Sequence, residues 1–514
     1  MLKRVFSICI VVIFMMGLLG ATIVFSASSK YKTKIEFSVA SFGTFNDDEF
    51  MKYVSNKFNV KIKPQALDWN NWEQQVNTWM AAGDMPDMLQ WDARPWKMKQ
   101  FKSWVSAGLL KPLPSLDKYP NLKALRSKMK IMDYYKINGK DYLWTKFRGD
   151  NKWSLAGPMA IMYRKDWAEK LGMAKEEYTI DELLKLAKAF VQKDPAGNGK
   201  GKTVGYAEVG WGWPWLLNYF NPYAATFVKV KGKWVWGPTM PETLEGIKFL
   251  RQMYKEGALW KDFYTAKDYD GVNLYMANRL GMWADNLGAD WNKYRTNFKT
   301  ANPKADVYKA TALMKIKGRD GKYFLQEWDN TWSAYLFSSK MSDEKFKRIL
   351  DIMDWAASPE GTRMCQFGFV NKDYVIKNNK IVLLWKKDSK GQYEKPDYIT
   401  TTADAVRNLA CLNGDFIYTD PTFDQKTLKD LIWLYKLPVS QPNNVKLAKI
   451  NYAFDFFSAP YKDKYANTLA SDFRQAVMKM VVSTDNIEGA LKKFIQQNQA
   501  KANAIIRELT KAGI

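Results

Sequence analysis

Residues 68–96 constrain the fold most strongly, because they have the pattern of a helix, a sharp turn and a short buried strand in quick succession. Asn70 and Glu73 occupy the positions of an N-terminal capping box, and residues 72–80 repeat apolar side chains at helical spacing. Gly83 ends this helix, and residues 88–90 are predicted as a parallel strand. Open α/β sheets bind ligands beyond the carboxyl ends of their strands, so the residues after this strand are candidate ligand contacts.

The residues before this stretch complete a lobe. Residues 34–40 and 60–64 are predicted strands, and residues 47–58 are a predicted helix between them. Strand, helix, strand, helix and strand are thus complete by residue 91, which favours a right-handed βαβ lobe. A new apolar strand follows at residues 159–163, and residues 281–286 form another strand that ends in polar groups. We expect the strand at residues 323–326 to return to the first lobe.

A helix closing in Ala82-Gly83-Asp84, followed by Pro86-Asp87 and a strand, resembles the extracellular solute-binding proteins of carbohydrate ABC importers. Further landmarks follow in the order of that family and cover nearly the whole chain after its leader, at residues 116–122, 138–142, 163–172, 355–361 and 473–494. The resemblance implies an α/β, two-lobed periplasmic-binding-protein-like fold of type II, with an interlobe ligand crevice and a hinge. We expect residues 34–155 and about 312–368 to form lobe 1, and residues 156–311 and about 369–514 to form lobe 2.

The composition excludes several function classes. The formal net charge is +25, yet the basic residues are scattered and no nucleic-acid motif occurs, so a basic surface facing an anionic cell envelope is favoured over nucleic-acid binding. The chain has no histidine, which removes histidine-based triads, histidine metal ligands and a histidine general base. No phosphate-binding loop is present.

The N-terminus has the layout of a secretory signal peptide. Residues 1–28 carry Lys3 and Arg4, an apolar run and then small residues. The run is also long enough to act as an uncleaved membrane anchor, and Ala21 stands where lipoprotein relatives have their cysteine. We therefore expect a secreted protein, on the outer face of the cell membrane or in the periplasm. Cys365 and Cys411 allow at most one disulfide after the leader, and their pairing stays open.

Tryptophans next to carboxylates suggest a sugar site, because a sugar has apolar faces and an equator of hydroxyls. Aromatic rings can stack on those faces, and planar polar side chains can bind the hydroxyls. Tryptophans on helix faces are assigned to the core instead. The candidate ligand-binding residues are Trp69, Trp91, Asp92, Trp211, Trp213, Trp283, Asp285, Trp328 and Asp329.

Residues 194–202 resemble an EF-hand-type calcium loop. Relatives often have a further acidic residue here, whereas this chain has Ala196 and Lys202 at two ligand positions. Asp194 and Asn198 are the remaining weak calcium candidates, and a glycine-rich turn is preferred. We therefore expect no metal and no cofactor.

We expect the chain to be the substrate-binding component of an ABC importer, which binds an oligosaccharide between its lobes and delivers it to a membrane permease. It is expected to be a monomer that breaks no bond. The alternatives are a secreted glycosidase, which also uses tryptophan-lined clefts with two carboxylates, and a receptor for a solute other than sugar. Nothing in the sequence places a catalytic acid and base together.

Overall fold

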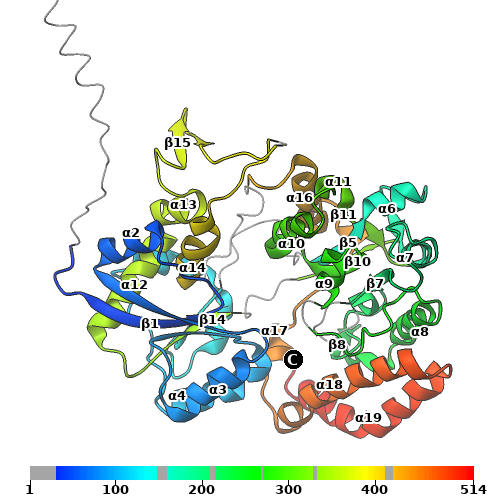
Figure 1. The fold of residues 1–514 in the computed structure, drawn as a ribbon. Coiled ribbons are helices and arrows are strands. Elements are labelled where there is room, and N and C mark those ends of the chain that lie inside the picture. Colours follow the sequence, from blue (N-terminus) through cyan, green and yellow to red (C-terminus); the bar gives the residue numbers. More distant parts are fainter. Residues whose placement is uncertain are drawn as a thin grey trace, which may run out of the picture.

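The computed structural model describes residues 30–146, 159–208, 215–267, 270–327, 333–389, 391–410 and 421–514, apart from the side chains of residues 286–293. These residues form two α/β lobes, which lie left and right in Figure 1. Within the described ranges, no helix has the length and apolar character needed to cross a membrane.

A five-stranded sheet organises lobe 1. Its three N-terminal strands are parallel, and β14 runs antiparallel between β3 and β4. In spatial order the strands are β2 (Val60–Ala66), β1 (Ile35–Ser41), β3 (Met88–Trp91), β14 (Ala334–Phe337) and β4 (Leu143–Thr145). The predicted parallel βαβ arrangement of residues 34–91 is therefore confirmed.

Helices cover both faces of this sheet, because its strands bury side chains on both sides. Phe37 and Met88 belong to a core with α2 and α12, whereas Leu89 and Trp91 belong to a core with α3 and α4. The helices of lobe 1 are α2 (Glu49–Phe58), α3 (Trp72–Ala82), α4 (Met98–Ser106), α5 (Pro120–Lys128), α12 (Asp343–Ala357), α13 (Pro359–Phe367) and α14 (Asp404–Leu409).

Two four-stranded sheets form the centre of lobe 2. The first contains β11 (Thr311–Leu313), β5 (Met159–Arg164), β10 (Leu280–Asn286) and β7 (Val204–Ala207). The second contains β17 (Val445–Ala448), β13 (Tyr323–Gln326), β12 (Ile316–Lys317) and β6 (Tyr178–Thr179). In the first sheet β10 is parallel to β7 and antiparallel to β5, so the carboxyl ends of β10 and β7 lie at the same edge.

Helices and two short hairpins complete the molecule. The helices of lobe 2 are α6 (Lys165–Lys170), α7 (Ile180–Lys193), α8 (Pro241–Lys255), α9 (Asp270–Met276), α10 (Leu287–Ala301), α11 (Val307–Ala310), α16 (Gln425–Ser440), α17 (Tyr452–Phe456), α18 (Pro460–Ser483) and α19 (Ile487–Lys511). The hairpins are β8 (Phe227–Val230) with β9 (Lys233–Trp236), and β15 (Tyr374–Lys377) with β16 (Lys380–Leu383).

The observed lobe boundaries differ from the predicted ones. The strand predicted to return to lobe 1 is β13, which pairs with β12 and β17 in lobe 2. Phe324 on this strand packs against Trp215 and Tyr219, with ring centroids 5.6 and 5.4 Å apart, and this aromatic contact holds it there. The chain re-enters the lobe 1 sheet only at β14. It then stays with lobe 1 well beyond residue 368, because residues such as Tyr398 and Val406 belong to the lobe 1 core.

One short helix joins the two lobes. Phe456 on α17 packs on Tyr134 and Tyr135 of lobe 1, with ring centroids 4.8 and 4.9 Å apart. Phe454, two residues earlier, packs on Phe227 and Trp234 of lobe 2 at 5.8 and 5.7 Å. In Figure 1 α17 lies at the base of the molecule between the lobes.

Candidate functional site

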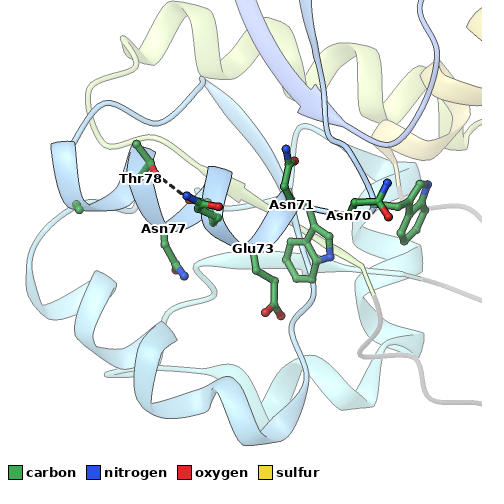
Figure 2. A pocket seen from close by; sticks show the side chains of 9 residues that line it. Asn70, Asn71, Glu73, Asn77 and Thr78 are labelled. Atoms are coloured by element: carbon green, nitrogen blue, oxygen red, sulfur yellow. Dashed lines mark hydrogen bonds between the residues drawn. The ribbon is translucent and has the colours of Figure 1, made fainter. Parts of the chain in front are cut away.

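A groove runs along α3 in lobe 1, with a volume of about 760 Å³. Figure 2 shows the side chains that line it, and Glu73 and Asn77 point to the same side of the helix. The lining residues are Trp69, Asn70, Asn71, Trp72, Glu73, Gln74, Asn77, Thr78 and Ala81. Two indoles therefore lie beside a row of amide, carboxylate and hydroxyl groups.

The start of α3 differs from the prediction by one residue. Asn71, not Asn70, is the N-cap, and its side chain makes no capping bond. The backbone N–H of Asn70 instead donates to Asp68 Oδ1 at 3.0 Å, which forms a turn ahead of the helix. The helix ends as predicted at Gly83, whose φ of 61° suits a residue without a Cβ.

Trp69 is held at the entrance of this groove. Its ring stacks on Phe42 at 3.8 Å between centroids and 17° between planes, and 42% of the residue remains exposed. Phe42 follows directly after β1, so a strand exit fixes the ring that supports Trp69. The exposed part of such an indole can contact an apolar partner.

A chain of charged groups lies beside the groove. Asp92 follows β3 and accepts hydrogen bonds from Arg94 Nε at 3.0 Å and Lys97 Nζ at 3.4 Å. Lys97 also donates to Glu73 Oε1 at 2.5 Å and lies 4.3 Å from the centre of the Trp72 ring. Two predicted site residues therefore lie at this groove: Trp69 lines it, and Asp92 is connected through Lys97 to Glu73, which also lines it.

Three predicted site residues are buried in the lobe cores. Trp91 is 2% exposed and packs against Phe101 and Trp104, because its position in the strand alternation points it inward. Trp283 is also 2% exposed, with its ring 4.4 Å from that of Tyr275. Asp285 is 5% exposed and accepts from Tyr294 Oη at 2.9 Å. Neither indole has an exposed face in this structure. Trp211, Trp213, Trp328 and Asp329 lie outside the described residues.

Glu208 is a site residue that the sequence reasoning missed. It follows β7, and it lies next to the exit of β10 because Ala207 pairs with Trp283. Its Oε2 accepts from the backbone N–H of Trp215 at 2.8 Å and from Tyr206 Oη at 3.3 Å, and Oε1 has no hydrogen-bond partner among the described residues. Burial raises the pKa of this carboxyl to about 8. The signal available in the sequence was a single acidic residue directly after an apolar strand.

In the loop after α7, both calcium candidates make hydrogen bonds within the protein. Asp194 Oδ1 accepts from Thr203 Oγ1 at 2.5 Å, and Oδ2 accepts from the Gly199 N–H at 2.7 Å. Asn198 Nδ2 donates to Thr203 Oγ1 and to the Asn278 carbonyl. Both carboxylate oxygens of Asp194 therefore accept a hydrogen bond from within the loop. Among the residues whose placement is described, no cluster of three metal-ligating side chains occurs.

Cys365 is a buried free thiol, and burial raises its pKa to about 12. Cys411 lies outside the described residues.

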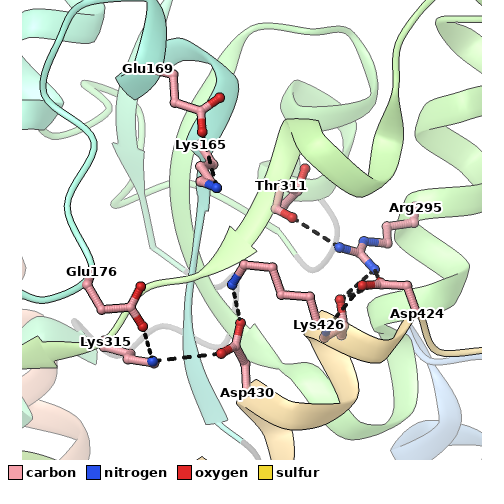
Figure 3. A network of polar contacts seen from close by, with 10 residues as sticks. Lys165, Glu169, Glu176, Arg295, Thr311, Lys315, Asp424, Lys426 and Asp430 are labelled. Carbon is pink, nitrogen blue, oxygen red and sulfur yellow. Dashed lines mark hydrogen bonds and ion pairs between the residues drawn. The ribbon is translucent and has the colours of Figure 1, made fainter.

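A second cavity in lobe 2 is smaller, at about 100 Å³, and several of its charged groups form ion pairs. Arg295 binds Asp424 at 2.6 Å and the Thr311 carbonyl at 3.0 Å. Lys426 pairs with Asp430 at 2.8 Å. Figure 3 shows that these contacts tie α16 to the neighbouring elements of lobe 2. We assign this network to the packing of α16 and not to ligand binding.

The chain has a two-lobed α/β fold with polar and aromatic side chains at its strand exits, which is the arrangement of two-lobed solute-binding proteins. The chain belongs to the family of bacterial extracellular solute-binding proteins, whose family profile matches residues 45–363, more than half of the chain. The resemblance predicted from the sequence is therefore confirmed.

Curated relatives are similar over part of their length. Lipoprotein LipO of Bacillus subtilis is 24% identical over 67% of this chain and 66% of its own. The polygalacturonan/rhamnogalacturonan-binding protein YtcQ of the same organism is 24% identical over 63% and 62%. The fructooligosaccharide ABC transporter substrate-binding protein FusA of Streptococcus pneumoniae is 28% identical over 46% and 48%. The chain thus aligns with just under two thirds, or less, of the length of these relatives.

Solved structures have the same fold over nearly the whole chain. The alginate-binding protein AlgQ2 has a TM-score of 0.66 at 18% identity, and covers 94% of this chain and 98% of its own. FusA in complex with kestose has a TM-score of 0.62 at 16% identity, over 93% and 98%. The predicted two-lobed fold class is therefore confirmed.

Proposed function

We propose that the protein is the substrate-binding component of an ABC importer and carries an oligosaccharide to a membrane permease. The α3 groove is the observation that carries this proposal. It places a half-exposed indole beside amide and carboxylate side chains, which is the combination that recognises both the apolar faces and the hydroxyls of a sugar. The relatives named for binding fructooligosaccharide and polygalacturonan support the same substrate class.

The ligand contacts proposed here come from both lobes. Trp69 and Asp92 belong to lobe 1, and Glu208 belongs to lobe 2. Among the described residues, the Oε1 atom of Glu208 has no hydrogen-bond partner, and a sugar hydroxyl would supply one. Contacts to both lobes exist together only in a closed form, so binding shifts the population toward that form. Trp211, Trp213, Trp328 and Asp329 remain proposed contacts from the sequence.

The same proposal includes the location and the partners of the protein. It acts outside the cell membrane as a monomer, with residues 1–28 as its leader or anchor, and it performs no bond cleavage. The permease and its ATPase supply the energy of import.

Replacing Trp69 with alanine tests the site. We expect W69A to bind its oligosaccharide about five- to thirtyfold more weakly, because one stacking contact contributes roughly 1–2 kcal/mol with its burial. The control is W96A, since Trp96 is 55% exposed in the same lobe but does not line the groove.

The ligand is first found by thermal shift with plant and bacterial oligosaccharides, and binding is then measured by calorimetry. A ligand at about 100 times its Kd adds roughly 2.7 kcal/mol to the stability of the folded form. An assay for new reducing ends follows each stabilising sugar. Intact sugar and a selective loss in W69A support the proposal. Cleaved sugar would establish a glycosidase, and equal affinities of W69A and W96A would remove the groove from the site.

A further inference from the structure

The hairpin of β15 and β16 projects from lobe 1 and pairs with no other described strand. Asn378 and Asn379 connect its strands with φ values of 50° and 59°, as in a tight two-residue turn. Tyr374 and Trp385 are buried at its base, and Trp385 Nε1 donates to the Phe367 carbonyl at 3.3 Å. A free two-stranded ribbon is only marginally stable, so these two anchors hold it on the lobe.

Beyond its base the hairpin exposes an aliphatic surface. Five of the twelve large apolar side chains that are exposed among the described residues fall between residues 370 and 384. They are Val370, Ile376, Ile381, Val382 and Leu384, with exposed fractions of 37%, 48%, 38%, 40% and 49%. Single exposed apolar residues are ordinary, but this ribbon exposes them on both of its faces, because Ile376 lies opposite Ile381 and Val382 lies on the other face.

The same hairpin is purely basic. Residues 374–387 contain Lys377, Lys380, Lys386 and Lys387 and no acidic residue. Lys377 lies directly opposite Lys380 in the strand register, and like charges in that position destabilise a hairpin. In the described part of the chain, no acidic group pairs with Lys377, Lys380 or Lys386. These lysines do not stabilise the hairpin itself, which points to an anionic partner outside the molecule.

We propose that the β15–β16 hairpin docks on the anionic phospholipid surface of the cell membrane. Aliphatic side chains that enter the interface and lysines that bind phosphate groups are the combination that such a surface retains. A second copy of the chain fits poorly, because two identical basic hairpins repel each other. The docking is independent of which solute is bound, since β15 and α3 lie at opposite ends of lobe 1 in Figure 1.

The test is co-sedimentation with lipid vesicles, using the chain without residues 1–28 so that the apolar leader does not bind lipid itself. Every described helix and strand begins after these residues. One set of vesicles contains phosphatidylglycerol and phosphatidylcholine in about equal parts, and the other contains phosphatidylcholine alone. We expect binding to the anionic vesicles only. Each lysine near such a surface contributes to attraction, so K377Q/K380Q/K386Q should lower the partition coefficient about tenfold or more.

A matched control comes from the other hairpin. K229Q/K231Q/K233Q removes three exposed lysines from β8, β9 and their turn and leaves the same net charge as the test variant. That hairpin has one large exposed aliphatic residue, Val230. This control should bind vesicles as the unmodified chain does. I376S/V382S should also bind more weakly, because it keeps the charge and removes apolar surface. Melting temperatures of all variants verify that they fold.

Three results would overturn the proposal. Equal losses in the two lysine variants would mean attraction by overall charge. Full binding by I376S/V382S would exclude insertion into the interface. Absence of binding to anionic vesicles would exclude a lipid partner, and the hairpin would then be tested against vesicles that contain the permease, where retention would identify a protein partner in its place.

Discussion

The titration of Glu208 makes the free energy of unfolding depend on pH. Burial raises the pKa of its carboxyl from 4.5 to about 8, so the folded protein holds a proton there that the unfolded chain has already released. The stability contributed by this proton is complete below about pH 4.5 and is lost as the pH rises toward 8. This pH dependence of stability is opposite in sign to that of a carboxylate in an ion pair, whose contribution is lost as the pH falls.

We therefore expect E208Q to be more stable than the unmodified chain at pH 8 to 9, by at most roughly 5 kcal/mol, and equally stable near pH 4.5. Glutamine keeps the size of the side chain and has no charge to bury. The measurement is urea unfolding of both proteins across this pH range. E182Q is the control, because Glu182 forms the exposed capping box of α7. A constant difference between E208Q and the unmodified chain at every pH would exclude titration of Glu208 as its cause.

The elements of the molecule divide into those set by local sequence and those set by distant contacts. The capping box of Thr179 and Glu182 sets the start of α7 locally, and local signals predicted the end of α3 at Gly83. They also predicted β3, but not that Trp91 at its end would turn into the core. Two successive strand residues point to opposite faces, and the sequence alone did not say which face is covered by α4.

The lobe assignment of β13 failed for a related reason. Its three successive apolar residues suit either lobe, and the choice depends on the contact of Phe324 with Trp215, residues far apart in the chain. Glu208 was missed because one acid after a strand has no spacing motif. Only the folded chain shows that Glu208 is buried and that its Oε1 has no hydrogen-bond partner among the described residues.

Helix α17 contacts both lobes, since Phe456 packs on lobe 1 and Phe454 on lobe 2. We expect F456A to lower the stability by about 1–3 kcal/mol and to broaden the urea transition or split it into two. Loss of this aromatic contact lets each lobe unfold more independently. Unfolding is followed by tryptophan fluorescence and by circular dichroism. The control is A453S, on the exposed side of the same helix. Coincident single transitions in F456A would show that other contacts couple the lobes.

On the scale of the whole molecule, the proposed function makes solute binding and lobe closure one equilibrium. Trp69 lies in lobe 1 and Glu208 in lobe 2. If one sugar touches both residues, each contact contributes fully only when the lobes are closed. Removal of either contact makes the closed form less populated. Removing the second contact then lowers the sugar affinity less than the same removal does in the unmodified chain.

We therefore expect the effects of W69A and E208Q on sugar affinity to be less than additive, with a coupling of about 0.5–3 kcal/mol. This coupling joins residues on separate lobes, and closure of the lobes supplies the connection between them. Calorimetry on the unmodified chain, both single variants and the double variant measures it. X-ray scattering should show that sugar reduces the radius of gyration most in the unmodified chain. Strict additivity together with an unchanged radius would mean that the sugar binds lobe 1 alone.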